Sequence, residues 1–164
     1  MRITGTVLKG WIKMNANYDS TDETLKHKLM VARYLRKFAT ELLFRAENHD
    51  ASKLEAPEKA IFDEYTPKLK NTTYGSDEYK QYLAEMQVAL HHHYMTNRHH
   101  PEHFQNDISG MNLIDVIEMF CDWIAATQRH ADGNIIDSIN INERRFMFSD
   151  ELKSILLNTI TDLM

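Results

Sequence analysis

Residues 113–124 read LIDVIEMFCDWI, and this stretch decides the fold more than any other part of the chain. Arranged as a helix, it is apolar around most of its circumference, which predicts a largely buried helix. Asp115, Glu118 and Asp122 nevertheless recur at i, i+3 and i+7, a spacing that stacks their carboxylates on one face. A buried carboxylate needs a cation, a metal ion or strong donors, whereas the plainer interpretation is a solvated acidic face.

Further helices are predicted on both sides of this one. Ser20 followed by Glu23, and Ser52 followed by Glu55, have the capping-box spacing that begins a helix. Apolar residues then recur at helical spacing, and the segments between helices carry proline and glycine. The predicted helices cover residues 20–47, 52–65, 77–96, 113–130 and 149–164. The fold class is therefore all-α, a single-domain bundle of five to six helices over residues 20–164 after an N-terminal arm, residues 1–19.

Length and composition narrow the class of protein. A chain of 164 residues with 43% hydrophobic and 26% charged residues fits one globular domain. A net charge of -5 gives no overall field that favours nucleic acid. No apolar run is long enough for a membrane span and no signal-peptide pattern is present, so we expect a cytoplasmic protein, or one of the host cytoplasm if a phage encodes it. The single cysteine fits a reducing compartment.

Histidine is the residue type that stands out. The chain has nine, six of them between His91 and His103. His27 shares a helical face with apolar residues, although a lone histidine there is more often a satisfied core residue than a ligand. The adjacent pair His49 and Asp50 cannot share a helical face, but at a helix end both side chains can reach one ion. Together with His27, Asp122 and histidines of residues 77–96, this pair would converge on one metal site.

The order of these residues resembles the HD-domain superfamily of metal-dependent phosphohydrolases. Residues 49–53, HDASK, are similar to the His-Asp-x-Gly-Lys form of some of its phosphodiesterases, with Ser52 in place of the glycine. The histidines at 92–93 and 99–100 resemble those that bind a second metal in its binuclear branches. Residues 101–104, PEHF, and 118–123, EMFCDW, also resemble a family of small uncharacterised bacterial and phage proteins.

The superfamily resemblance implies an HD-like fold holding one or two divalent transition-metal ions (Mn, Fe, Co, Ni or Zn). The implied ligands are His27, His49, Asp50, Asp122, His92 or His93, and His99 or His100. The implied reaction is hydrolysis of a nucleotide or another small phosphoester. Lys53 would stabilise developing phosphate charge, and Glu118 would accept a proton or orient a ligand histidine.

Substrate contacts are expected from Asn97, Arg144 and Arg145, although a solvated basic pair is the simpler interpretation of the two arginines. His91, His103 and His130 are expected at the surface or behind the ligands. Two alternatives stay open: an HD-type di-iron oxygenase, and a non-catalytic binding protein that a metal stabilises. The oligomeric state does not follow from the sequence.

Overall fold

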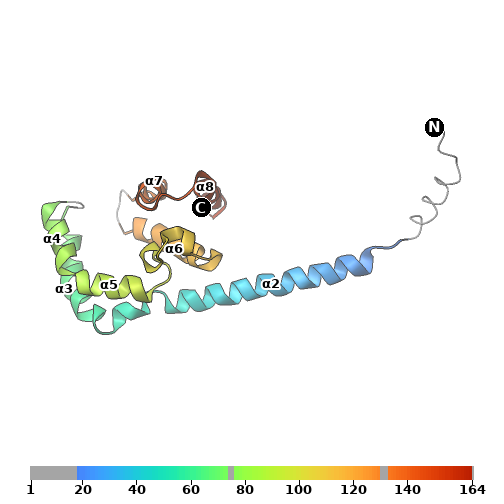
Figure 1. Cartoon of the computed structure of the whole chain (residues 1–164), viewed down its shortest axis with the longest axis horizontal. Helices are drawn as coiled ribbons and strands as arrows, with labels where there is room; N and C mark the ends of the chain where they lie inside the picture. The colour runs from blue at the N-terminus through green and yellow to red at the C-terminus, as the bar shows by residue number, and fades with distance from the viewer. Residues whose placement is uncertain (1–17, 74–75, 130–132, 164) are drawn as a thin grey trace. The chain divides into compact units, whose positions relative to one another are not determined.

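The computed structural model describes residues 18–73, 76–129 and 133–163 (Figure 1). Over these ranges the chain forms seven α-helices and three short 3₁₀ helices, with no β-strand. The all-α prediction is confirmed, but five to six helices was too few. Most of the predicted N-terminal arm, residues 1–17, and His130 lie outside the described residues. No helix in the described ranges combines the length and apolarity needed to cross a membrane.

The elements in chain order are α2 (Thr21–Asn48), η1 (Ala51–Leu54), α3 (Glu58–Lys70), α4 (Asp77–Glu85), α5 (Gln87–Thr96), η2 (Pro101–His103), η3 (Asp107–Gly110), α6 (Leu113–Thr127), α7 (Ile135–Phe146) and α8 (Asp150–Leu163). Chain contacts divide the protein into two compact units, residues 1–40 and 41–164, with the boundary inside α2. Each unit is described by itself.

In the first unit, the described chain is the N-terminal part of α2. Its start agrees with the predicted helix, and the Asp19 carboxylate accepts a hydrogen bond from the Thr21 N–H at 2.9 Å. This bond satisfies one of the backbone donors that a helix start leaves free. The side chain of His27 is exposed, so the inward direction predicted from its apolar neighbours is not found.

In the second unit, α6 is the central helix that its sequence predicts. Asn112 caps it: its side chain accepts from the backbone N–H groups of the first turn, and the Asp115 side chain reaches back to the Asn112 N–H. The inner face of α6 packs against α7 and α8 around a core of fully or nearly buried side chains. These are Ile108, Met119, Phe120, Trp123, Ile139 and Leu156.

The helices before α6 differ from the prediction in two places. The helix predicted over residues 52–65 is instead η1 followed by α3, because Pro57 interrupts the chain before Glu58, and α3 then runs through Pro67 to Lys70. The helix predicted over residues 77–96 is divided at Met86 into α4 and α5. The predicted irregular stretch, residues 97–112, contains only η2 and η3. These elements bring η1, α3 and α5 into contact with one another.

Candidate metal centre

The centre begins at the turn where α2 ends. Asp50 adopts a left-handed backbone conformation with φ 58° and ψ 14°, which Asp and Asn tolerate better than most residues. The turn lets neighbouring side chains face the same region, and His49 Nε2 lies 3.8 Å from Asp50 Oδ2. The sequence predicted this use of a helix end for the His49–Asp50 pair.

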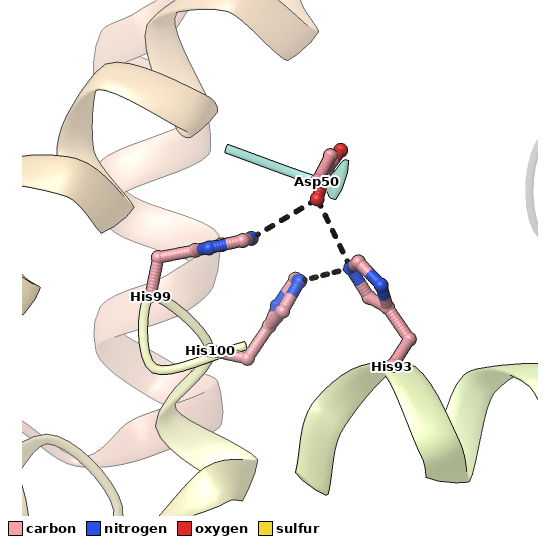
Figure 2. A group of neighbouring side chains, drawn as sticks. All are labelled: Asp50, His93, His99 and His100. Carbon is pink, nitrogen blue, oxygen red and sulfur yellow. Dashed lines mark hydrogen bonds and ion pairs between the residues drawn. The ribbon is translucent and has the colours of Figure 1, made fainter. Parts of the chain in front are cut away.

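Four side chains converge beside this turn: Asp50, His93, His99 and His100, which we name the Asp50 group (Figure 2). His93 comes from α5, and the adjacent pair His99 and His100 from the segment that follows it. Each offers one ligand atom, and all four atoms lie within 4.8 Å of one another. The Asp50 group therefore has three imidazole nitrogens and a carboxylate oxygen directed at one small volume.

The spacing inside the group matches the edges of a coordination polyhedron. Asp50 Oδ1 lies 3.2 Å from His93 Nε2 and 3.4 Å from His99 Nε2. The Nε2 atoms of His93 and His100 are 2.8 Å apart. Ligands bound about 2.0–2.1 Å from an ion at octahedral to tetrahedral angles are roughly 2.9–3.4 Å from one another. These three separations are thus close to those that ligands of one transition-metal ion would have, and the remaining ones are no longer than 4.8 Å.

Unpartnered buried atoms also fit an ion. Among the described residues, Asp50 Oδ1 and His99 Nε2 are buried without a hydrogen-bond partner of good geometry. Such atoms are costly unless something compensates them. Burial, together with the charges of nearby His99 and His93, lowers the pKa of His100 to about 3. His100 is therefore neutral, the form in which imidazole binds metal.

A second cluster shares one member with the first. His49, His99 and Glu118, named the Glu118 group, also bring three potential ligand atoms together. Glu118 Oε1 accepts from His49 Nδ1 at 3.0 Å and lies 3.2 Å from His99 Nδ1. A neutral imidazole has one N–H and one lone pair, so His99 cannot serve both groups as an ordinary ligand. Carboxylates commonly orient metal-bound histidines through the remote N–H, which favours Glu118 as support for the Asp50 group.

The acidic face of α6 has three different sets of partners. Asp115 is fully buried and is paired with Arg45 and Arg98, the cations that its burial requires. Glu118, one turn later, bonds to His49 and to Arg45 Nη1, the latter at 2.8 Å.

The third acid, Asp122, belongs to neither group. Its Oδ1 lies 3.7 Å from His49 Nε2. The nearby carboxylates of Asp122 and Glu118 outweigh partial burial and raise the pKa of His49 to about 10. His49 therefore carries a proton in the metal-free protein at neutral pH. His49 and Asp122 lie at the edge of the Asp50 group, and their predicted ligand role stays a prediction.

Three other predicted residues adjoin the Asp50 group without joining it. Lys53 Nζ donates to Asp50 Oδ2 at 2.6 Å. The Asn97 amide donates to Ser52 Oγ at 2.8 Å and to the His93 carbonyl at 2.9 Å. Because these bonds already engage the amide of Asn97, it supports His93 in this structure. His92 is not a member of the group, and its Nδ1 donates to Glu58.

The remaining predicted residues lie elsewhere. His27 is in the first unit and in neither group, and its ligand role stays a prediction. Arg144 and Arg145 are exposed in the last turn of α7, where Arg145 donates to Glu102. Their predicted substrate role stays untested.

Of the histidines expected outside the ligand set, His91 is exposed, and His103 Nδ1 lies 3.1 Å from the Tyr94 carbonyl.

Sequence reasoning missed three residues around the centre. Arg45 and Arg98 compensate the acids of α6, and Glu58 bonds to two histidines of α5. The arginines also line a small pocket beside His99, where their ion pairs already engage them. Helical spacing placed Arg45 on the helix predicted over residues 20–47, but no local pattern links it to residues some seventy positions away.

Fold and site together define an all-helical protein with a buried His/Asp cluster that could hold a metal ion. A family model matches residues 16–162, and the chain belongs to that family, DUF5662, a family of unknown function. No curated protein and no solved structure matches the chain. The expectation of an uncharacterised family is confirmed, while these comparisons provide no link to the HD-domain superfamily.

Proposed function

We propose that this protein is a metal-dependent phosphohydrolase whose ion is held by the Asp50 group. The observation that carries the proposal is the convergence of four ligand atoms, two of them buried without a hydrogen-bond partner of good geometry. Three nitrogens and one oxygen favour a first-row transition metal such as Zn, Fe, Co or Ni over Mg or Ca. When bound, such an ion polarises a phosphoryl oxygen and makes water more acidic, the chemistry that phosphoester hydrolysis needs.

The residues around the group supply the remaining parts of a hydrolytic site. Lys53 places an ammonium group beside Asp50, where it can stabilise negative charge that develops on a phosphate. The protonated ring of His49 lies with Nδ1 toward Glu118 and Nε2 toward Asp122. Its Nε2 is positioned to give that proton to a leaving oxygen, or, without the proton, to bind a second ion with Asp122.

A structural metal is the second candidate, and one observation favours it. Four protein ligands are enough to fill a tetrahedral shell, as in structural zinc sites, whereas catalytic sites keep a position open to water. The two functions differ in what removal of the ion does. An enzyme keeps its helices after chelation and loses turnover, whereas a structural site unfolds.

The test compares tag-free protein with Asp50→Asn, each loaded in turn with Mn, Fe, Co, Ni or Zn. Asparagine keeps the size of aspartate and tolerates the left-handed backbone at position 50, so the variant removes charge with little strain. Asp137→Asn, at the exposed start of α7, is the matched control. Phosphomonoesters, phosphodiesters and nucleotides are the substrates.

We expect turnover by the parent and the control and none by Asp50→Asn, with equal helix content in all three. Equal turnover in Asp50→Asn and the parent would contradict the proposal. Absence of turnover in every loaded form, with unfolding on chelation, would favour the structural metal. Iron with dioxygen consumption would favour the oxygenase alternative.

A further inference from the structure

Glu58 is a buried carboxylate that the proposed chemistry does not use. It is the first residue of α3, and its side chain is fully buried. Its Oε1 accepts from His92 Nδ1 at 2.7 Å, and its Oε2 accepts from His93 Nδ1 at 2.9 Å. One buried acid therefore bonds to two adjacent histidines of α5, of which only His93 belongs to the Asp50 group.

The surroundings of Glu58 favour a charged carboxylate. Its two oxygens face imidazole nitrogens at 2.7 and 2.9 Å. Glu58 is also the first residue of α3, where the positive end of the helix dipole favours negative charge. A charged carboxylate accepts an N–H bond more strongly than a neutral oxygen does.

This bond decides which nitrogen of His93 carries the proton. Two other polar atoms approach His93 Nδ1: Asn97 Nδ2 at 2.9 Å and Ser52 Oγ at 3.3 Å. The Asn97 amide already donates to Ser52 Oγ and to the His93 carbonyl. The carboxylate of Glu58 is therefore the strongest acceptor near His93 Nδ1, and we place the ring hydrogen on Nδ1. The lone pair of a neutral His93 is then on Nε2, the atom that faces Asp50 and His100.

We propose that Glu58 is a positioning residue that fixes His93 as an Nε2 metal ligand and holds its neighbour His92 outside the ligand set. The inference rests on the proposed metal centre. The same arrangement recurs at Glu118, which bonds to the Nδ1 side of His49 and lies beside the Nδ1 of His99. Two acids on different helices, Glu58 and Glu118, thus lie on the Nδ1 side of histidine rings of the two groups.

The experiment measures affinity for Co²⁺ and the visible absorption spectrum of the Co²⁺ form in the full-length protein. Glu58→Gln keeps the shape of the side chain, but its amide can accept from only one of the two histidines. His92→Asn is the matched control, because asparagine keeps a donor near the position of Nδ1 and removes the ring. The thermal midpoint of each metal-free protein reports structural damage separately from metal affinity.

We expect Glu58→Gln to weaken Co²⁺ binding by about 10- to 100-fold and to change the spectrum. His92→Asn should leave both close to those of the parent. If Glu58→Gln matched the parent, or if His92→Asn weakened binding as much, the positioning role would be wrong while the metal centre stood. A parent protein that bound no Co²⁺ would overturn the metal centre itself.

One measurement needs no variant and keeps the inference testable if Glu58→Gln does not fold. Long-range ¹H–¹⁵N NMR correlations of the Zn²⁺ form identify which ring nitrogen of each histidine carries hydrogen. We expect hydrogen on Nδ1 of His93 and none on its Nε2. Hydrogen on Nε2 of His93 in the metal-bound protein would overturn the proposal.

Discussion

Replacing Asp115 by asparagine tests the pairing that allows an acid to be buried at the start of α6. The carboxylate accepts four hydrogen bonds: from Arg45 Nη2 at 3.1 Å, Arg98 Nε at 3.0 Å, Arg98 Nη2 at 2.7 Å and the Asn112 N–H at 3.0 Å. Each oxygen receives two of them. An asparagine has one acceptor oxygen, so two of the four contacts become donor against donor whichever way the amide is turned.

The expected loss follows from those two contacts. Hydrogen bonds to charged groups contribute about 1.5–3 kcal/mol each, which gives roughly 3–6 kcal/mol for two. The Arg98 side chain is 42% exposed and can turn toward water, so the lower end applies. We therefore predict that Asp115→Asn lowers the free energy of unfolding by about 3 kcal/mol, within the range for breaking a buried ion pair.

The assay is urea unfolding of the metal-free protein at neutral pH, followed by far-UV circular dichroism. Asp63→Asn is the matched control, because Asp63 pairs with Lys59 on the surface, with 64% of its side chain exposed. An exposed pair of this kind contributes at most about 1 kcal/mol. A loss for Asp115→Asn no larger than that for Asp63→Asn would refute the view that Arg45 and Arg98 compensate this acid.

Three further predictions concern the core, the site and pH. Ile139→Ala removes a fully buried side chain that packs with residues of α6 and α8. It should lower the free energy of unfolding, measured in urea, by about 2–5 kcal/mol. A decrease below about 1 kcal/mol would contradict this packing. Lys53→Met should lower phosphoester turnover without weakening metal binding. A kinetic assay and a metal titration of the same protein check this. Unchanged turnover would exclude a role of Lys53 in stabilising phosphate charge. The lowered pKa of His100, about 3, makes its contribution to metal-free stability present above its unfolded pKa near 6.5 and lost as pH falls toward 3. The raised pKa of His49, about 10, means that its contribution to the stability of the metal-free protein is present below pH 6.5 and is lost as pH rises toward 10. The free energy of unfolding should therefore fall on both the acid and the alkaline side of neutral pH. His49→Gln should reduce the pH dependence of this free energy on the alkaline side only.

The sequence predicted the parts of the fold that depend on local pattern. The apolar surface of residues 113–124 was enough to predict α6. The sequence pattern did not predict α7, whose first turns mix isoleucines with polar residues. Nor did it predict the break at Met86, where helical spacing continues. Both depend on tertiary packing, which overrides local preference.

The candidate site was predicted in kind but not in detail. The pair His49–Asp50 and the histidines of residues 92–100 were recognised as metal-binding residue types. The choice of His93 over its neighbour His92 depends on the direction in which α5 presents each ring. Glu58 was missed because an acid just after proline looks like an ordinary first-turn residue that favours a helix start.

The metal content of the purified protein is the most direct test of the central claim. Tag-free parent and His99→Asn are dialysed extensively without chelator, analysed for Mn, Fe, Co, Ni, Cu and Zn, and checked for helix content. The Asp50 group predicts at least one equivalent of a transition metal in the parent and its loss in the variant, whose helices remain. The same metal content in both proteins, or none in the parent even after reloading, would contradict it.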